Sequence, residues 1–224
     1  METVIATDKG TIEYGAAWEL QKELFAAVSD ARKEGSEIMH HLLLCEHPHV
    51  YTLGKSGVEE NLLVNPEFLK SIGATYFRTD RGGDITYHGY GQLVGYPILD
   101  LERLGLGLKE YVHLLEETVI DTVAEYGIDA GRLEGATGVW IEPETARARK
   151  ICAIGVKASR FVTMHGFALN VSTDMGYFSH INPCGFIDKG VTSIVKEMGS
   201  DPGMEDVKRV YKVHFQEVFK CKIK

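Results

Sequence analysis

Cysteine is scarce in this sequence, and none of it is paired at close spacing. The four cysteines among the 224 residues are Cys45, Cys152, Cys184 and Cys221, and no two of them form a CxxC motif. This spacing argues against a structural zinc site and against the disulfide framework of a small secreted protein. We therefore expect a reducing, cytoplasmic environment and no bound metal.

Long apolar runs and an excess of basic residues are also missing. The longest aliphatic cluster is 42–44, far short of the roughly 20 residues that a transmembrane helix needs. The first 15 residues carry acidic side chains and lack the apolar segment of a secretory signal. The formal net charge is -8, whereas nucleic-acid binding favours a basic surface. We expect neither a membrane nor a nucleic-acid partner.

One stretch departs from this acidic character. Residues 145–160 contain five cations and no acid: Arg147, Arg149, Lys150, Lys157 and Arg160. On an acidic chain, such a patch could attract an acidic partner. The alternative is a solvated strand edge that lysine and arginine protect from aggregation. Charge alone does not separate the two.

Several common catalytic motifs are absent. The sequence has no GxSxG elbow, Walker A loop, HExxH motif or Rossmann fingerprint. His47 and His49 lie near an expected strand end, but no cysteine or acid stands at ligand spacing, so we interpret them as loop histidines. Cysteine chemistry is what remains.

Apolar periodicity and turn signals predict the secondary structure. Helices are expected at 16–34, 67–72, 108–126 and 205–219, and strands at 37–45, 50–54, 75–78, 93–101, 137–141, 150–156 and 161–171, with a loop at 174–190. The elements interleave without strict βαβ alternation and without a long linker. The fold class is therefore predicted as α+β, with residues 1–224 forming a single domain built on a mixed β-sheet flanked by helices.

The stretch RGGDITYHGYGQLVGYP, residues 81–97, combines polar side chains with closely spaced glycines. Glycines let a backbone approach a ligand with no side chain in the way. Arg81, Thr86, Tyr87 and His88 can form hydrogen bonds or carry charge, and an apolar strand follows them. This pattern favours a pocket floor over a surface loop, although a glycine-rich hairpin without a ligand is the simpler alternative.

Among the cysteines, Cys184 is the best candidate nucleophile. It lies in an Asn-Pro-Cys-Gly loop, where Gly185 leaves room for a substrate. Cys45 and Cys152 lie in expected strands, as buried thiols do, whereas Cys221 lies at the tail of the last expected helix and is interpreted as structural or exposed. Cys152 is a minority candidate, because strand alternation would place it on the same face as Lys150.

A thiol needs a nearby base or cation to react at neutral pH. The sequence offers Lys150, Lys157, His88 and His165 for that role, and residue chemistry alone does not choose among them.

Four blocks of the chain resemble the lipoyl(octanoyl) transferases, which belong with the biotin and lipoate protein ligases. They are RGGDITYHGYGQLVGYPILDL from Arg81, KICAIGVK from Lys150, HGFALNV from His165 and INPCG from Ile181; HPHVYTLGK from His47 is also similar to the family. The resemblance covers most of residues 47–190 and implies a biotin/lipoate protein ligase-like fold. Tyr90 stands where the family usually has proline, which removes a φ constraint from that loop.

The resemblance also implies roles for individual residues. Cys184 corresponds to the acyl-thioester nucleophile, and Lys150 to the lysine that acts with it. The implied substrate-binding residues are Arg81, Gly82, Gly83, Asp84, Ile85, Thr86, Tyr87, His88, Ala153, Ile154, Gly155, Gly166, Phe167 and Ala168.

The implied reaction transfers an octanoyl group from acyl carrier protein to a lysine of a lipoyl domain. The acceptors of the family are lipoyl domains of 2-oxoacid dehydrogenases and the glycine cleavage H protein, and a monomer is the default state. No cofactor is implied, because a thioester donor is already activated. Two alternatives are an ATP-dependent lipoate or biotin protein ligase and a non-catalytic module that binds an acyl carrier protein.

Overall fold

A computed structural model describes residues 1–182 and 189–224 of the chain. Cys184, the predicted nucleophile, lies outside the described residues. In chain order the elements are β1 Thr3–Thr11, α1 Tyr14–Glu34, β2 His40–Glu46, β3 Val50–Leu53, η1 Glu59–Asn61, α2 Pro66–Ser71, β4 Thr75–Arg78, β5 Ile85–His88, β6 Gln92–Ile98, α3 Leu108–Ala124, β7 Ala130–Leu133, β8 Ala136–Ile141, β9 Arg149–Ser159, β10 Val162–Asn170, η2 Met175–His180, β11 Gly190–Val191, α4 Ile194–Met198, α5 Met204–Phe219 and β12 Lys222–Ile223.

The predicted helices are confirmed, and local chemistry explains their ends. After α1, Gly35 adopts a left-handed conformation with φ 68° and its N–H bonds the carbonyls of the last turn, as a glycine C-cap does. At the start of α2, the Asn65 side chain accepts a hydrogen bond from Phe68 N, and Pro66 occupies the first turn. These signals are local, so a single sequence reveals them.

The strands form a large mixed sheet and a small one. The large sheet has the order β12-β1-β2-β6-β10-β9-β8-β7, with β11 pairing to β9 outside that path. β1 runs parallel to β2 and β12, whereas the central strands β2, β6, β10, β9 and β8 pair antiparallel. The small sheet has the order β4-β3-β5. The predicted α+β class with a mixed sheet flanked by helices is confirmed.

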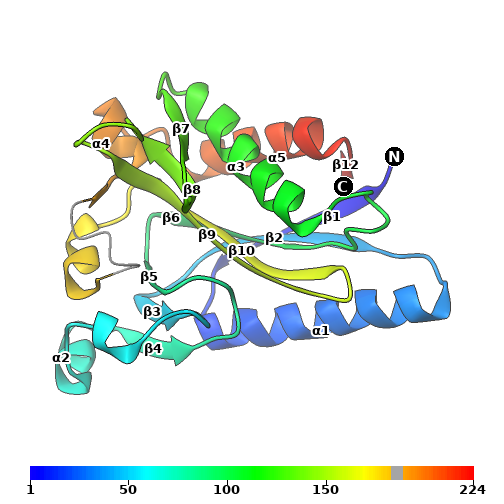
Figure 1. Cartoon of the computed structure of the whole chain (residues 1–224), viewed down its shortest axis with the longest axis horizontal. Coiled ribbons are helices and arrows are strands. Elements are labelled where there is room, and N and C mark those ends of the chain that lie inside the picture. The colour runs from blue at the N-terminus through cyan, green and yellow to red at the C-terminus, as the bar shows by residue number, and fades with distance from the viewer. Residues whose placement is uncertain (183–188) are drawn as a thin grey trace.

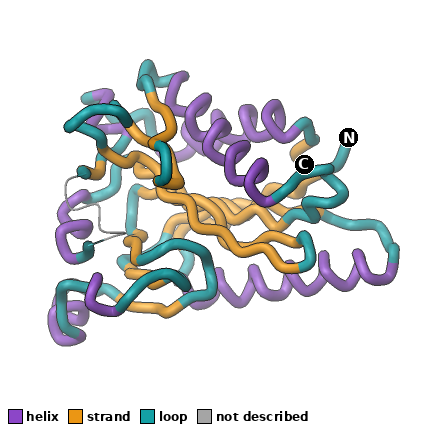
Figure 2. The backbone as a smooth tube through the Cα atoms, viewed as in Figure 1, coloured by secondary structure: helices purple, strands orange, loops and turns teal. Residues whose placement is uncertain are grey.

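Helices cover both faces of the large sheet. Figure 1 shows α3 and α5 on one face and the long helix α1 on the other, with the small sheet and α2 beside α1. The tube in Figure 2 shows the two chain ends close together at one side of the molecule, where β12 pairs with β1. The small sheet therefore lies against one face of the large sheet and can enclose space between them.

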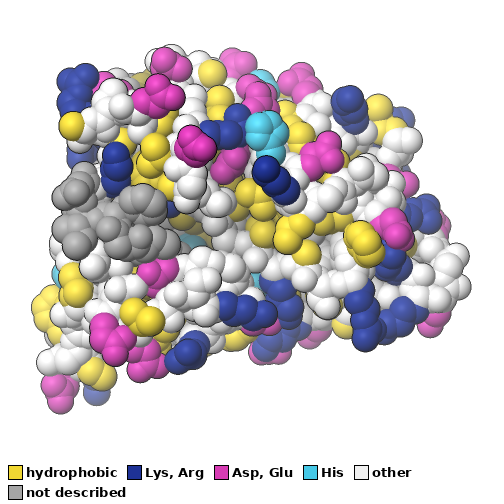
Figure 3. All heavy atoms as spheres, in the orientation of Figure 1, with side chains coloured by type: hydrophobic (Ala, Val, Ile, Leu, Met, Phe, Trp, Pro, Cys, Tyr) yellow, Lys and Arg dark blue, Asp and Glu magenta, His cyan; other side chains and the backbone are white. Residues whose placement is uncertain are grey.

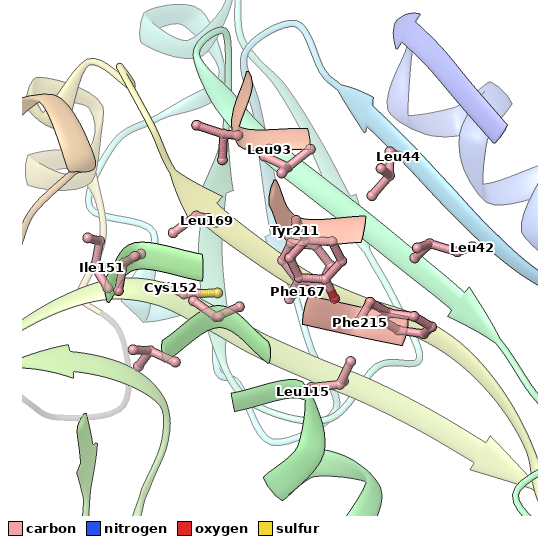
Figure 4. Close-up of a cluster of buried hydrophobic side chains, with 14 of the residues drawn as sticks. Leu42, Leu44, Leu93, Leu115, Ile151, Cys152, Phe167, Leu169, Tyr211 and Phe215 are labelled. Atoms are coloured by element: carbon pink, nitrogen blue, oxygen red, sulfur yellow. The ribbon is translucent and has the colours of Figure 1, made fainter. Parts of the chain in front are cut away.

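The main core lies between the large sheet and the pair α3–α5. Figure 4 shows aliphatic side chains of β2 and β6 around Phe167, Tyr211 and Phe215. The ring of Phe167 stacks on that of Tyr211 with centroids 4.4 Å apart. Gly95 is the partner of Phe167 on the neighbouring strand β6, and a Cβ added at Gly95 would lie 2.0 Å from the Phe167 ring. Only glycine at position 95 leaves room for the Phe167 ring to lie against β6.

The prediction missed several short or polar elements. β1 has few buried side chains, and β7, β11, β12 and α4 are only two to five residues long. Tertiary pairing decides their structure, so periodicity does not reveal them. The predicted loop 174–190 also contains η2.

The glycine beneath Phe167 provides a test of the core. We expect Gly95→Ala to lower the free energy of unfolding by about 1–3 kcal/mol, because the new methyl group overpacks against the ring. Gly131→Ala in β7 is the matched control, since its Cβ would meet only Pro143 at 3.6 Å. Urea denaturation measures both; equal stability of the two variants would contradict the packing described.

Candidate functional site

A cavity of about 430 Å³ lies between the small sheet and the large sheet, within the usual range for small-molecule sites. It is lined by most of the residues predicted from the sequence: Arg81, Gly83, Asp84, Ile85, Thr86, His88, Lys150, Ala153, Ile154, Gly155, Gly166, Phe167 and Ala168. The structure therefore brings three separate stretches of the chain to one place. The sequence had suggested only a floor; residues 81–88 form the opposite wall.

Small residues on neighbouring strands keep the cavity open. Ala168 of β10 pairs with Ala153 of β9 and with Val94 of β6, and directly paired residues share one face of a sheet. All three line the cavity. Because two of these three positions carry only a methyl group, a flexible chain can lie along the strands.

A β-bulge directs Lys150 into the cavity. Cys152 pairs with Val139, but Lys150 pairs with the next residue, Trp140, so Ile151 is an extra residue on β9. Ile151 and Cys152 both lie in the main core, whereas Lys150 lines the cavity. The prediction that Lys150 and Cys152 share a face is wrong, because the bulge interrupts the alternation.

The surroundings of Lys150 keep its amine near the cavity rim. Its Nζ donates a hydrogen bond to the carbonyl oxygen of Thr137 at 3.1 Å and lies 4.6 Å from the centre of the Trp140 ring. Gly138 has φ 120°, and a Cβ there would meet the Cys152 carbonyl oxygen at 2.5 Å. Glycine at this position therefore lets β8 approach the bulge that carries Lys150.

Arg81 forms part of the wall opposite the floor. Its guanidinium is buried and donates hydrogen bonds to the carbonyl oxygen and the hydroxyl of Thr52 and to the carbonyl oxygen of Gly82. The turn that carries it rests on Gly155, where a Cβ would lie 2.9 Å from the Gly82 carbonyl oxygen. Gly82 N also donates to the Val156 carbonyl oxygen at 2.9 Å. Gly155 thus serves a close backbone contact that joins the wall to the floor.

Asp84 has a structural connection in addition to its place on the cavity. Its carboxylate accepts hydrogen bonds from the Asn61 amide at 2.6 Å and from Ile85 N at 2.6 Å. The Asn61 carbonyl oxygen in turn accepts from Asn182 N at 2.8 Å. Asp84 therefore connects the wall, through Asn61, to Asn182.

A chain of buried hydrogen bonds crosses the cavity floor. His88 Nδ1 donates to Gln92 Oε1 at 2.8 Å, Gln92 Nε2 donates to Asn170 Oδ1 at 2.8 Å, and Asn170 Nδ2 donates to the Thr192 carbonyl oxygen at 3.0 Å. Sequence reasoning did not select Gln92 or Asn170, although an amide inside an apolar strand is a usable signal, because buried amides need partners.

Two predicted residues do not line the cavity. Gly82 contacts β9 through its backbone, as described above. Tyr87 points to the other side of its strand, where its hydroxyl bonds His49 Nδ1 at 2.7 Å and its ring stacks on Tyr177 at 4.9 Å. Period-two alternation along β5 explains this, since Thr86 and His88 line the cavity on either side of it.

The loop around Tyr90 is fixed without the usual proline. Gly91 N donates to Glu46 Oε2 at 2.8 Å, and the Gly91 carbonyl oxygen accepts from Val171 N and Ser172 N. The Tyr90 ring is half exposed and contacts His49 edge-on at 5.2 Å. Hydrogen bonds on both sides of this glycine take over the restraint that proline would supply.

The three described cysteines are buried thiols. Burial raises the pKa of Cys45 and Cys152 far above the ordinary value, and raises that of Cys221 to about 11. Figure 4 shows Cys152 among the core side chains. None of the three lines the cavity. The interpretation of Cys45 and Cys152 as core residues is confirmed, Cys221 is buried rather than exposed, and Cys184 lies outside the described residues.

The rival bases differ from Lys150 in their surroundings. Burial lowers the pKa of His165 to about 4 and that of His88 well below its ordinary range. Lys157 pairs with Asp80 at 2.5 Å, and the same carboxylate accepts from His165 Nε2 at 2.8 Å. The three groups therefore already serve structural hydrogen bonds, two of them as neutral imidazoles.

Three of the five cations in the stretch 145–160 form ion pairs with acids outside it. Arg147 pairs with Glu142 at 2.9 Å, Arg149 pairs with Glu142 and Glu197, and Lys157 pairs with Asp80. Figure 3 shows positive and negative side chains interspersed over the visible face. These pairs favour the solvated strand edge over a docking face for an acidic partner.

The described residues contain no candidate metal site and no candidate membrane-spanning helix. Among residues 1–182 and 189–224, no group of three or more histidine, cysteine or acidic side chains could hold a metal ion. Within those same ranges, every helix is too short or too polar to cross a membrane.

Comparisons with known proteins agree on one family. The family model for the Lipoyl protein ligase A/B catalytic domain matches residues 13–216. An octanoyltransferase from Bacteroides fragilis is 62% identical over 204 residues, which cover 91% of this chain and 92% of that protein.

Solved structures support the predicted fold. A bi-partite lipoate protein ligase from Thermoplasma acidophilum superposes with a TM-score of 0.71 at 16% identity, covering 100% of this chain and 85% of that chain. A biotin protein ligase from Aquifex aeolicus gives a TM-score of 0.51 at 13% identity, covering 98% and 69%. The biotin/lipoate protein ligase-like fold is confirmed.

The burial of three thiols predicts selective labelling. We expect iodoacetamide at pH 8 to leave Cys45, Cys152 and Cys221 unmodified in the folded protein, because the reactive thiolate is suppressed and access is blocked. All three should react in denaturant. Peptide mass spectrometry measures both conditions, and alkylation of Cys152 in the folded protein would contradict its place in the core.

The buried histidines predict a stability loss in mild acid. Burial lowers the pKa of His47 and His165 to about 4, so between pH 6.5 and 4 the unfolded chain binds protons that the folded chain does not. We expect the free energy of unfolding to fall across this window by up to about 1.4 kcal/mol per pH unit for each histidine. Urea titrations at several pH values should show a shallower slope for His47→Asn; an unchanged slope would contradict neutral burial.

Proposed function

Because the chain belongs to the Lipoyl protein ligase A/B catalytic domain family and transfers octanoyl groups, we propose that the transfer proceeds through a thioester on Cys184 with Lys150 as its acid–base partner. We further propose that residues 1–224 act as a single catalytic domain in the cytoplasm. The donor is octanoyl-acyl carrier protein, and the acceptors are lipoyl domains of the 2-oxoacid dehydrogenases and the glycine cleavage H protein.

The position of Lys150 carries this proposal. The bulge at Ile151 turns its side chain from the core to the cavity, and bulges often re-aim a side chain beside an active site. Val191 of β11 pairs directly with Lys150. Phe178 and Lys189, which stand on either side of the segment 183–188 in the sequence, both line the same cavity. Lys150 therefore borders the same cavity as the two described residues that flank this segment in the sequence.

The cavity floor is suited to an acyl chain. Ala153, Ala168 and Val94 offer an apolar surface along the strands. Burial of each methylene of a chain contributes about 0.8 kcal/mol. We therefore propose that the octanoyl tail lies along β9 and β10, with its carbonyl carbon near Lys150.

In the first half-reaction, the Lys150 amine takes the proton from the Cys184 thiol, and the thiolate attacks the thioester carbonyl carbon. The tetrahedral intermediate collapses, the bond to the carrier sulfur breaks, and that sulfur takes the proton from the Lys150 ammonium. The acyl group is now bound to Cys184. No ATP is required, because one thioester replaces another of similar energy.

In the second half-reaction, the amine of the acceptor lysine attacks the acyl group on Cys184. Lys150 takes a proton from the attacking nitrogen as the amide bond forms, and returns it to the departing Cys184 sulfur. The enzyme regains its starting protonation state. General acid–base catalysis of this kind contributes typically 10²–10⁴-fold.

An ATP-dependent ligase is the second candidate function. The observation in its favour is the overall similarity to a lipoate protein ligase, but at 16% identity this likeness concerns the fold alone. A fold does not define a reaction, whereas the residues of the site do. The two candidates are separated by the donor that each requires.

Intact-protein mass spectrometry after mixing with octanoyl-acyl carrier protein tests the thioester. We expect a gain of one octanoyl group on the native protein, discharge of that group by a lipoyl domain, and no gain for Cys184→Ala. Cys152→Ala is the matched control and should be acylated normally. Acylation that survives in Cys184→Ala would refute the assignment of the nucleophile.

Lys150→Ala tests the base in the same assay. We expect acylation to slow by about 100-fold or more at pH 7 and to recover partly as the pH rises towards the ordinary thiol pKa of ~8.5, where the thiolate forms unaided. Lipoyl-domain modification that requires ATP and free octanoate would instead favour the ligase. Binding of the donor with no acylation at all would favour a non-catalytic module.

A further inference from the structure

The cavity has an exposed end and a buried end. Near Lys150 it is bordered by the exposed residues Gly135, Thr137 and Gly190. At the opposite end it is bordered by Tyr14 and His165, which are 2% and 1% exposed. An acyl chain that enters beside Lys150 therefore runs towards Tyr14 and His165.

Tyr14 is held firmly at the buried end. It is the first residue of α1, and its ring packs against His47, Phe77 and His88 with centroids 5.3, 5.2 and 5.9 Å away. The rings of His88 and Tyr14 are nearly parallel, at 13°. Three aromatic neighbours from three different strands or loops leave the Tyr14 ring little freedom to move aside.

His165 is held in an unusual backbone conformation. Its φ is 60°, in the left-handed region that few non-glycine residues adopt. Two hydrogen bonds stabilise it there: its backbone N–H donates to Gln21 Oε1 at 3.0 Å, and its Nε2 donates to Asp80 Oδ1 at 2.8 Å. Backbone strain that the surroundings enforce is concentrated at functional sites. Here it turns the imidazole to the cavity, against the alternation of β10.

The atoms around His165 are unsuited to a longer apolar chain. Among the described residues, Trp18 Nε1, Gln21 Nε2 and His165 Nδ1 are buried without a hydrogen-bond partner. Gln21 contacts His165 directly, and the Trp18 ring lies 6.2 Å from the imidazole. A methyl end that advanced among these atoms would prevent water from reaching them, which is unfavourable for polar groups.

The length of the strands matches the proposed substrate. His165 pairs with Val156, three residues beyond Ala153, the first cavity-lining residue after the bulge. At about 3.4 Å per residue this separation is roughly 10 Å. Seven staggered carbon–carbon bonds of about 1.5 Å each extend roughly 9 Å. An eight-carbon chain would therefore fill the floor and stop at the wall.

We propose that Tyr14 and His165 form the closed end of the acyl cavity and thereby set the longest acyl chain that the enzyme transfers. This inference rests on the proposed transfer function and adds the two residues that determine its chain-length specificity. It assigns a role to a helix residue far from the glycine-rich stretch in the sequence. It also assigns one to His165, which among the described strands is the one non-glycine residue with a positive φ.

Single-turnover loading by acyl carrier proteins with six-, eight-, ten- and twelve-carbon chains tests the wall. In the native protein we expect loading to drop about ten-fold or more between eight and twelve carbons, because a rigid pocket can reject added methylenes by that factor. A rate that rises steadily through twelve carbons would overturn the inference, since an open cavity rewards each added methylene. This comparison requires no variant.

Two variants on different elements test the residues themselves. Tyr14→Leu shortens the side chain from α1, and His165→Asn shortens that from β10 while keeping a residue that tolerates the left-handed region. We expect each to raise the ratio of twelve-carbon to eight-carbon loading by about ten-fold. Val28→Ala is the control, because Val28 is a buried residue of α1 that does not line the cavity; its ratio should match the native one.

The possible outcomes distinguish a failure of the chain-length inference from a failure of the proposed octanoyl transfer. If both folded variants load octanoyl normally and keep the native ratio of twelve-carbon to eight-carbon loading, Tyr14 and His165 do not limit chain length. The proposed transfer reaction is unaffected by that result. Failure of the native protein to load any chain overturns both. Cooperative thermal melting of each variant shows that the loading rates belong to folded protein.

Discussion

The site depends on one constraint, which is the bulge in β9 where the strand passes between the core and the cavity. A regular strand would bury Lys150 in the core that contains Cys152 and Val139, where an ammonium group would be strongly destabilising. The extra residue Ile151 lets two consecutive apolar side chains face the core and returns the lysine to the cavity. The same strand then continues with small residues along the floor, so a single irregularity separates a reactive end from an apolar one.

The cavity is bordered by polar groups that are mostly neutral or paired. His88 and His165 line the cavity, His47 packs against Tyr14, and burial holds all three as neutral imidazoles. The Asp80 carboxylate bonds both Lys157 and His165, and those bonds hold its pKa at about 2 despite burial. Hydrogen bonds also hold the buried Arg81 guanidinium of this wall to Thr52 and to the Gly82 carbonyl oxygen, so connected polar groups fix the positions of the wall. The connected amides of Gln92 and Asn170 extend the same arrangement to Thr192, the residue that follows β11.

Most of the fold could be predicted from the sequence, because its signals are local. Gly35 and Gly127 end helices, Asn65–Pro66 begins one, and alternation identifies the central strands. The glycine-rich stretch and the four family blocks also identified the residues of the cavity. What could not be predicted depends on pairing between distant segments: the parallel strands at the termini, the division of residues 81–97 between two sheets, and the bulge.

The same limit explains why the buried end of the cavity escaped sequence reasoning. Tyr14 lies just before the helix predicted at 16–34, and the sequence indicates His165 only as a possible base in an alternating strand. Only the contact between α1 and β10, made through Gln21 and the His165 backbone, shows that both border one cavity. A motif records residues that are neighbours in sequence, whereas the end of a cavity is made by whichever elements meet there. Of the two residues proposed to limit chain length, Tyr14 therefore lies outside every block that identifies the family, whereas His165 begins one of them.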